Sequence, residues 1–123
     1  MDFSVSSEQV ENGVHMISLA GEVDLYTAPE FKQELLKVIG DDDEPKQVVV
    51  DLTATTFIDS TTLGVLVGGV RRLRPKGGQL SLVCDDRNIT KIFEITGLDR
   101  VFTIYPTREE ALAAVASAAG PTG

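Results

Sequence analysis

Val48-Val49-Val50-Asp51-Leu52 is the stretch of sequence that decides the fold. Three β-branched residues follow one another here with no polar residue between them. A strand with one face in water alternates apolar and polar residues, whereas a strand covered on both faces is apolar throughout. Such strands are typical of parallel sheets with helices packed against them. The stretch therefore predicts an α/β domain that contains a buried strand at residues 48–50.

Downstream of this strand, the sequence predicts a polar stretch at 53–56 and then a helix that begins near Asp59 or Ser60. Apolar residues recur along that helix at the spacing of one buried face. They are Leu63, Leu66, Val67, Val70 and Leu73. Gly64 and Gly68 are four residues apart and share one face of the helix, where we expect a close approach to a neighbouring element.

Upstream of the buried strand, two strands at 3–7 and 14–23 are expected to form a hairpin through Asn12-Gly13, a dipeptide typical of tight turns. A helix follows the hairpin. Thr27-Ala28-Pro29-Glu30 has the pattern of a capping box, in which the hydroxyl and the carboxylate each accept a hydrogen bond from a free backbone N–H. Gly40 is expected to end this helix.

The remaining sequence continues the alternation of strands and helices. Its expected elements are a strand at 80–84, a helix at 88–96, a strand at 101–105 and a helix opening with a second capping box, Thr107-Arg108-Glu109-Glu110. The full order, β-β-α-β-α-β-α-β-α, predicts a small mixed sheet flanked by about four helices. We expect a single domain over 1–117 and a flexible tail over 118–123.

Length and charge narrow the function. A chain of 123 residues fits one domain. Its formal net charge of −8 argues against nucleic acid and anionic membranes as partners, because both repel an acidic protein. No apolar run approaches the roughly 20 residues that span a bilayer, and the amino terminus lacks the pattern of a signal peptide. The sequence therefore predicts a soluble, cytoplasmic domain.

The sequence offers little for catalysis, cofactors or metals. Neither the P-loop pattern nor the dinucleotide-binding pattern occurs in it. Cys84, the only cysteine, has no second cysteine or nearby histidine with which to bind a metal, and we interpret it as a buried apolar residue. His15 lies within a strand and far from any nucleophile, and we interpret it as structural or exposed at the surface. We expect no enzyme activity and no cofactor.

Asp51 directly follows the buried strand, where open α/β sheets place functional groups. We favour a turn residue at the end of the strand. The alternative is the phosphate-accepting aspartate of a receiver domain. Such a site also needs an acidic pair after the first strand to hold magnesium, and the sequence has none there.

Phe57-Ile58-Asp59-Ser60-Thr61-Thr62-Leu63-Gly64 places three hydroxyl residues in succession at the start of a helix. Asp59 or Ser60 can cap that helix, which accounts for one polar residue but not for three. The free N–H groups and the positive end of the helix dipole also tolerate a phosphate. Phosphorylation of Ser60 would add a charge of about −1.5 to −2 beside Asp59. The motif is thus compatible both with plain capping and with a phosphorylation switch.

Three stretches of the chain, taken in order, resemble the anti-anti-sigma factors, or anti-sigma factor antagonists, of the STAS domain class. They are Gly21-Glu22-Val23-Asp24-Leu25-Tyr26-Thr27-Ala28-Pro29, then Val48-Val49-Val50-Asp51-Leu52, then Phe57-Ile58-Asp59-Ser60-Thr61-Thr62-Leu63-Gly64-Val65-Leu66. The resemblance covers nearly the whole chain and is most specific at the Asp-Ser-Thr segment. It implies a single STAS-like domain, a small sheet flanked by helices, which agrees with the order of elements above.

By this resemblance, the protein binds an anti-sigma factor that is also a serine kinase, and so frees a sigma factor. Phosphorylation of the serine in the Asp-Ser motif blocks the binding, and a serine phosphatase reverses it. The phosphorylated residue is then expected to be Ser60, flanked by Asp59, with Asp24 nearby across the partner-binding face. We expect this face to include Thr61 and Thr62 as well.

One position departs from the family pattern. Members usually carry glycine two positions after the phosphoserine, where this chain has Thr62. A β-branched threonine adds bulk and stiffness in the first helical turn. We expect the change to narrow the choice of partner, to slow the kinase, or to offer a second hydroxyl for modification.

Two other functions stay open at this point. One is a STAS docking subunit of a larger signalling or transport complex that is indifferent to phosphorylation. The other is the receiver-like use of Asp51. The charge pattern does not decide whether the chain forms homo-oligomers.

Overall fold

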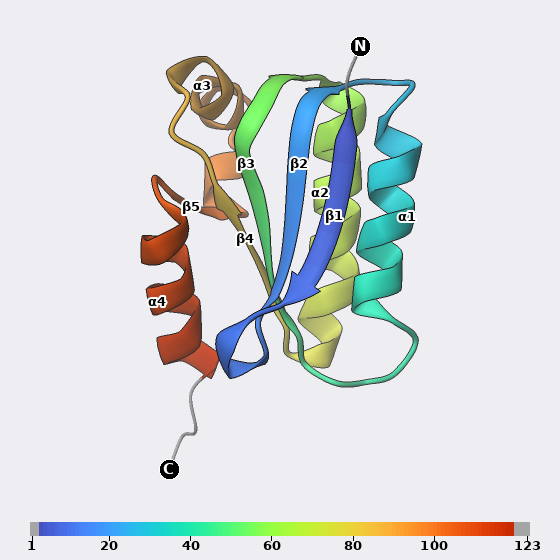
Figure 1. Ribbon diagram of the computed structural model, residues 1–123, viewed down its shortest axis with the longest axis vertical. Coiled ribbons are helices and arrows are strands. Elements are labelled where there is room, and N and C mark those ends of the chain that lie inside the picture. Colours follow the sequence, from blue (N-terminus) through green and yellow to red (C-terminus); the bar gives the residue numbers. More distant parts are fainter. Residues whose placement is uncertain (1–2, 120–123) are drawn as a thin grey trace.

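The computed structural model describes the backbone of residues 3–119 and the side chains of residues 3–115 (Figure 1). Its strands, in sheet order, are β1 (Ser4–Gln9), β2 (His15–Val23), β3 (Gln47–Ile58), β4 (Gln79–Val83) and β5 (Thr103–Tyr105). Its α-helices are α1 (Ala28–Ile39), α2 (Ser60–Leu73), α3 (Arg87–Thr96) and α4 (Arg108–Ala119). The predicted α/β fold, a mixed sheet flanked by helices, is confirmed.

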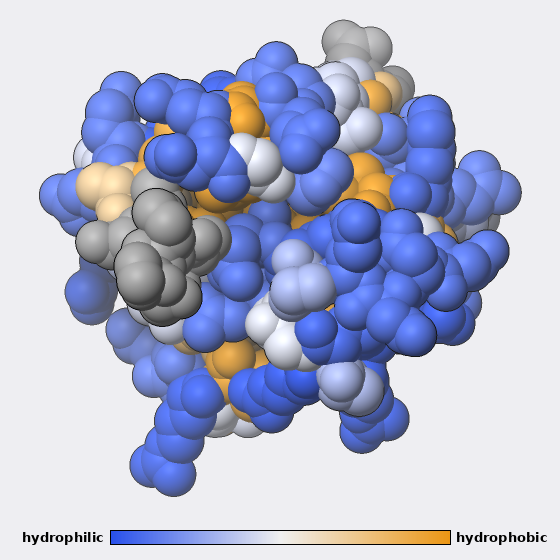
Figure 2. All heavy atoms as spheres, turned by 90° about the horizontal axis from the view of Figure 1, so that it is seen from below, coloured by the Kyte–Doolittle hydropathy of each residue, from blue (hydrophilic) through white to orange (hydrophobic). Residues whose placement is uncertain are grey.

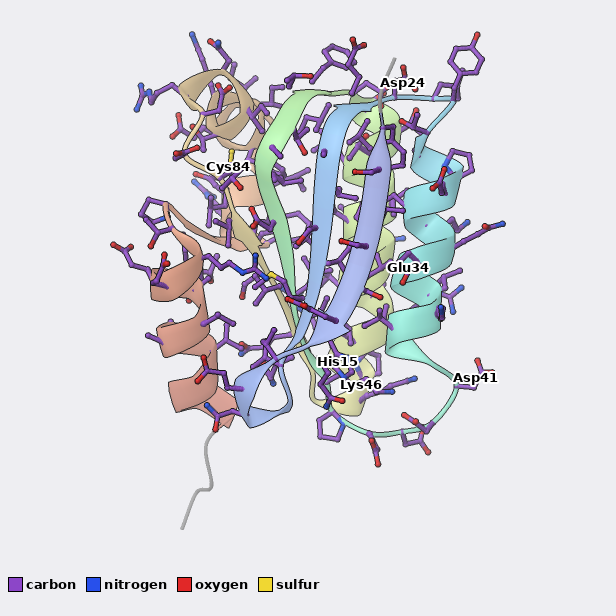
Figure 3. The ribbon with its side chains drawn as sticks, in the orientation of Figure 1. His15, Asp24, Glu34, Asp41, Lys46 and Cys84 are labelled. Carbon is purple, nitrogen blue, oxygen red and sulfur yellow. The ribbon has the colours of Figure 1, made fainter. Side chains whose placement is uncertain are left out.

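The first two strands form the predicted hairpin. β1 pairs antiparallel with β2, and the turn between them uses the left-handed backbone conformation at Asn12 (φ 60°) and Gly13 (φ 73°). Asparagine and glycine tolerate this conformation better than other residues, which is why this dipeptide marks the turn. β2, β3, β4 and β5 are all parallel to one another. Their carboxyl ends therefore meet at one end of the sheet, the end at which Asp24 lies in Figure 3.

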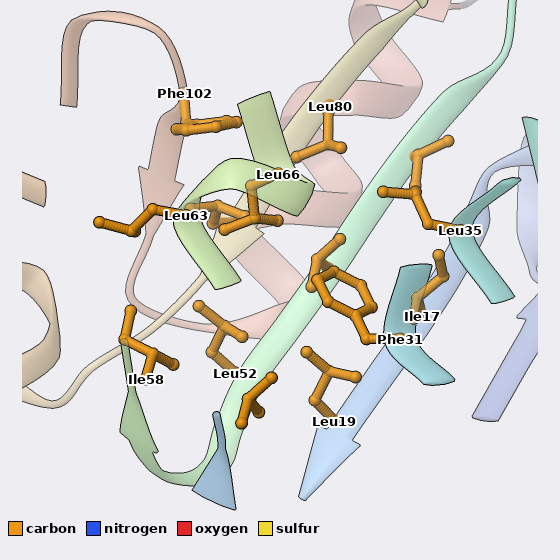
Figure 4. Close-up of a cluster of buried hydrophobic side chains, with 14 of the residues drawn as sticks. Ile17, Leu19, Phe31, Leu35, Leu52, Ile58, Leu63, Leu66, Leu80 and Phe102 are labelled. Carbon is orange, nitrogen blue, oxygen red and sulfur yellow. The ribbon is translucent and has the colours of Figure 1, made fainter. Parts of the chain in front are cut away.

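Helices cover both faces of the sheet. α1, α2 and α3 pack on one face, where they enclose the larger core with side chains of the strands (Figure 4). α4 packs on the other face over a smaller core. Val48 and Val50 point into the larger core and Val49 into the smaller one, and all three are buried. The prediction that this strand is buried on both faces is confirmed.

β3 is longer than the sequence predicts. The polar stretch at 53–56 belongs to this strand, which continues to Ile58. Polar residues favoured a loop, but the backbone groups of these residues pair with β2, in the register Ala20↔Ala54 and Gly21↔Thr55. Two shifts of register accompany this second half of the strand. Three of these four residues are threonines, whose β-branched side chains favour a strand, so local preference and pairing with β2 act in the same direction.

The first capping box is wrong in its details. Thr27 precedes α1 but has a helical backbone conformation, and its side chain makes no capping hydrogen bond to the helix. Its hydroxyl instead donates to the backbone carbonyl of Glu22, at 2.9 Å. In the second box, the Glu110 N–H donates to the Thr107 hydroxyl at 3.1 Å, so that the threonine half of the box is confirmed.

The expected close approach at Gly64 and Gly68 is also wrong. A Cβ atom built at either glycine would meet no atom within 4 Å, so this face of α2 is open. Gly69 makes the close approach instead, because its Cβ would lie 2.9 Å from Leu35 and 3.0 Å from Leu80. The three glycines lie on two different faces of one helix, and the sequence pattern does not say which face meets α1 and β4.

Smaller differences concern element ends. Residues 98–100 form a short 3-10 helix, so the last strand begins at Thr103 and not at 101. Residues 118–119, expected to begin the tail, belong to α4, and the rest of the expected tail, 120–123, lies outside the described residues. Within the part that the structure describes, no helix combines the length and the apolar character needed to cross a membrane.

Candidate functional site

Two neighbouring strands end side by side at the predicted site. In the register of β2 and β3, Val23 is paired with Ile58. Asp24 and Asp59 are the next residues along these two strands, so the sheet brings them together although 35 positions separate them in the sequence. Ser60 then begins α2 directly beyond Asp59. The structure thus gathers Asp24, Asp59 and Ser60 at the carboxyl ends of the parallel strands β2 and β3.

Asp59 is the N-cap of α2. One of its carboxylate oxygens, Oδ1, accepts hydrogen bonds from the backbone N–H groups of Thr61, at 3.0 Å, and of Thr62, at 3.2 Å. An aspartate at this position satisfies N–H groups that have no partner within the helix and also favours the positive end of the helix dipole. Ser60 is exposed at the first position of the helix. The start of α2 therefore leaves Ser60 accessible to solvent.

Asp24 orders the segment between β2 and α1. Its Oδ1 accepts from the backbone N–H groups of Tyr26, at 2.9 Å, and Thr27, at 3.1 Å. In the other direction, the backbone N–H of Asp24 donates to the Thr27 hydroxyl at 2.9 Å. These bonds form a tight turn of the kind that aspartate favours. Asp24 and Asp59 therefore have the same local task, which is to organise the turn that follows a strand of the sheet.

Thr62 does not lie on the surface. It is 0% exposed, and its hydroxyl donates to the backbone carbonyl of Val23 at 2.7 Å. The expectations that Thr62 contacts a partner or offers a second hydroxyl for modification do not agree with this burial. Its side chain instead ties the start of α2 to the end of β2. The signal for this was present, because Thr62 extends the buried stripe of Leu66 and Leu73 by one helical turn.

Large apolar side chains are exposed at the same end of the sheet. Leu25 is 61% exposed and Tyr26 is 87% exposed, and both directly follow Asp24. Phe57, near the end of β3, is 46% exposed. The opposite end of the molecule, seen in Figure 2, is covered mostly by hydrophilic residues. Exposed aromatic and aliphatic side chains beside polar ones are typical of surfaces that bind proteins. The sequence did not predict these three residues as part of the site.

Asp51 lies elsewhere. It is inside β3 and not at a strand end, so its interpretation as a strand-end turn residue is wrong, because the strand continues beyond it. It is 8% exposed, and its carboxylate accepts from the backbone N–H of Thr53, at 2.9 Å, and from the Thr53 hydroxyl, at 2.7 Å. A guanidinium nitrogen of Arg108 lies 3.9 Å from it. These contacts give Asp51 a structural role between the sheet and α4.

The histidine and the cysteine are not near the site. His15 begins β2 at the end of the sheet opposite Asp24, and its burial, followed by the charge of Lys46, lowers the pKa of its imidazole (Figure 3). Cys84 is buried as predicted, and burial raises the pKa of its thiol. Among the residues that the structure describes, no group of three or more histidine, cysteine, aspartate or glutamate side chains could hold a metal ion.

Comparison with known proteins identifies the relatives of this chain. The model of the STAS domain family matches residues 7–111. The anti-sigma-B factor antagonist of Bacillus subtilis is 31% identical over 109 residues, covering 89% of this chain and 96% of that protein. The anti-sigma-B factor antagonist of Listeria monocytogenes is 36% identical over 107 residues, covering 85% of this chain and 90% of that protein.

A solved structure agrees with these sequence relatives. The crystal structure of an anti-sigma factor antagonist from Mycobacterium paratuberculosis superposes with a TM-score of 0.82 and 32% sequence identity. The superposition covers 93% of this chain and 94% of that one. The likeness therefore extends over nearly the whole chain.

Proposed function

The chain belongs to the STAS domain family, and on that premise we propose that it is an anti-sigma factor antagonist controlled by phosphorylation of Ser60. The unmodified protein binds an anti-sigma factor that has serine kinase activity, and the binding frees a sigma factor. The kinase transfers phosphate to Ser60 and ends the complex, and a serine phosphatase restores it. The protein itself acts by binding and catalyses no reaction.

One observation carries this proposal. Ser60 is exposed at the first position of α2, directly after the N-cap Asp59, and Leu25 and Tyr26 are exposed at the same end of the sheet, directly after Asp24. A kinase must reach the hydroxyl of its substrate, and a binding partner needs apolar area that is free to be covered. Both conditions hold for the surface formed by Asp24, Leu25, Tyr26, Asp59 and Ser60, which we name the Ser60 surface.

The phosphate would act through charge. It brings about −1.5 to −2 charges to a surface that already contains Asp24 and Asp59. The five residues of the Ser60 surface include no basic side chain, so the surface itself offers the phosphate no opposite charge. Covering such a group with a partner removes it from water without an opposite charge, at a free energy of several kcal/mol. Each 1.4 kcal/mol weakens binding about tenfold, so a micromolar complex would be lost.

The fold itself need not change. Two N–H groups at the start of α2 already donate to the Asp59 carboxylate. A phosphate on Ser60 could accept hydrogen bonds from them only by displacing that carboxylate. The phosphate can remain in solvent on the exposed side of Ser60. The switch would thus alter the surface that the partner meets and leave the helix and sheet in place.

The decisive experiment combines site mapping with binding. The full chain is incubated with ATP and the purified anti-sigma factor kinases of the source organism, and the modified residue is located by mass spectrometry. We expect one phosphate, on Ser60, which is absent in Ser60→Ala and present in Thr61→Ala. Ser60→Ala should bind the kinase as the wild type does, and Ser60→Asp should bind at least tenfold more weakly.

Two results would contradict the proposal. Equal affinity of Ser60→Ala and Ser60→Asp would show a docking subunit that does not respond to phosphorylation. Phosphate on Thr61 alone would move the switch to the neighbouring hydroxyl. Circular dichroism of Ser60→Asp serves as the control, because an unfolded variant would lose binding for an unrelated reason.

A further inference from the structure

A groove of about 500 Å³ separates α1 from α2 and begins beside the Ser60 surface. The two helices lie side by side on one face of the sheet (Figure 1). Leu25 and Thr61 line the groove at the end near Ser60, and Arg72 lines it near the other end of α2. The groove is therefore continuous with the Ser60 surface, since Leu25 belongs to that surface and Thr61 follows Ser60 in the helix.

The floor of the groove is open because of two glycines. Gly64 and Gly68 line it, and a Cβ atom at either position would have nothing within 4 Å. The walls are mostly aliphatic, with Ala28, Leu36 and Val65 among them. Glycines four residues apart on a helix are about 6 Å apart along its axis. The groove thus offers two adjacent places for apolar side chains, at the spacing of positions i and i+4 of a second helix.

The charges at the groove have one sign. Lys32 and Arg72 are the charged residues among the described residues that line it, and both are exposed cations. The whole chain, in contrast, has 19 acidic and 11 basic side chains. A groove that collects cations within an acidic protein is complementary to a segment with carboxylates on its flanks.

We propose that this groove binds an acidic amphipathic helix of the anti-sigma factor partner, an inference that rests on the proposed function. Aliphatic side chains at positions i and i+4 of that helix would enter over Gly64 and Gly68. Carboxylates on its two sides would approach Lys32 and Arg72. This is the helix-in-groove mode of recognition, in which apolar anchors give affinity and flanking charges give orientation. The partner would then contact the chain well beyond the phosphorylated serine.

The test uses positions that are far from Ser60 on the same helix. Gly68 and Arg72 are eight and twelve residues beyond Ser60, or about 12 and 18 Å along the helix axis. Gly68→Leu fills the floor, where space for its side chain exists. Arg72→Glu reverses one flanking charge. Arg71→Glu is the matched control, because Arg71 is exposed on the same turn and does not line the groove.

Affinities are measured by titration calorimetry with the full chain and the anti-sigma factor kinase that phosphorylates it. We expect Gly68→Leu and Arg72→Glu each to weaken binding at least tenfold, and Arg71→Glu to change it less than twofold. Thermal unfolding of each variant must remain cooperative. If Ser60→Asp abolishes binding while both groove variants bind as the wild type does, the groove proposal is wrong and the phosphorylation switch stands.

A second probe covers the case in which no anti-sigma factor binds the unmodified chain and the proposed function fails. A synthetic helical peptide, with leucine at positions i and i+4 between glutamates, is titrated into isotope-labelled protein and followed by NMR. Shifts of the Gly64 and Gly68 amides that disappear in Arg72→Glu support the groove as a site for acidic helices. Unchanged chemical shifts of these amides on addition of the peptide overturn the proposal. A dimer of the chain that Arg72→Glu dissociates also overturns it, because a second copy would then occupy the groove.

Discussion

At the start of α2, two adjacent threonines have opposite environments. Thr61 is partly exposed, whereas Thr62 is fully buried and bonded to the Val23 carbonyl at 2.7 Å. Thr62→Ala would leave that carbonyl without its bond in a buried place. We expect the free energy of unfolding to fall by about 1–3 kcal/mol, measured by urea denaturation. Thr62→Gly should lose about 1 kcal/mol more, because glycine is a poor helix former.

Thr61→Ala is the matched control for this prediction. An exposed substitution of this kind usually changes the free energy of unfolding by less than about 0.5 kcal/mol. Equal effects of the two substitutions would mean that the Thr62 bond contributes nothing. The comparison also separates the two possible roles of Thr62. A structural tether predicts lower stability with normal partner affinity at temperatures where the variant is folded, whereas a contact residue predicts the reverse.

His15 predicts a dependence of stability on pH. Burial, and next the charge of Lys46, lowers the pKa of its imidazole below the ordinary value of 6.5. As the pH falls through that value, the unfolded chain takes up a proton before the folded chain does. The contribution of His15 to the free energy of unfolding should therefore be greatest above about pH 6.5. It should decrease as the pH falls and level off below the lowered pKa.

The measurement is urea denaturation between about pH 7.5 and 5.5, where histidine is the side chain whose ordinary pKa lies in the range. His15 is the only histidine in the chain, so His15→Gln should flatten the curve over this interval. A variant with the same slope as the wild type would assign the pH dependence to other groups. A slope of opposite sign would mean that the folded environment raises the pKa.

At the scale of one element, α2 presents two kinds of glycine. Gly64 faces open space, so Gly64→Ala should raise the free energy of unfolding by up to about 1 kcal/mol through helix propensity. A Cβ at Gly69 would press on Leu35 and Leu80 at 2.9 and 3.0 Å. Crowding of a packed core typically costs about 1–3 kcal/mol, so Gly69→Ala should be less stable than Gly64→Ala by at least about 1 kcal/mol. Thermal and urea denaturation of the two variants provide the comparison, and equal stability would contradict the packing described for this helix.

β3 shows where element prediction from sequence stops. Its first half was predictable, because three adjacent valines are typical of a strand that is covered on both faces. Its second half, 53–56, is polar enough to indicate a loop, but three of its four residues are threonines, whose β-branched side chains favour a strand. Pairing of its backbone with β2 makes it one. That extension matters for the site, since it takes Ile58 to the level of Val23 and so places Asp59 beside Asp24.

At the scale of the whole molecule, Arg108 joins parts that are far apart in the sequence. Its guanidinium lies 3.0 Å from Glu8 of β1 and 3.9 Å from Asp51 of β3. It thus links the start of α4 to two strands of the sheet. Arg108→Met keeps most of the apolar side chain and removes the charge. We expect the free energy of unfolding to fall by up to about 1 kcal/mol, because ion pairs that are partly exposed contribute little.

Salt concentration distinguishes loss of the ion pairs from loss of side-chain packing in Arg108→Met. Urea denaturation at low and high salt should show a smaller difference between Arg108→Met and the wild type at high salt, where exposed charges are screened. Glu8→Gln is the control and should have the smaller effect, because Glu8 is exposed and Asp51 is nearly buried. A difference that does not respond to salt would assign the loss to packing of the arginine side chain.

The sequence by itself determined the order of strands and helices, the buried strand at 48–50, the hairpin at Asn12-Gly13 and the position of Ser60 at a helix start. These features are local, because backbone conformation, capping and hydrophobic period depend on residues that are near one another in the chain. Tertiary structure decided the rest. It bonded the Thr62 hydroxyl to the Val23 carbonyl, opened the groove at Gly64 and Gly68, and set the ends of β2 and β3 side by side. Those features depend on which surfaces meet, and the pairing of two strands is fixed only when the whole sheet and the helices that cover it have assembled.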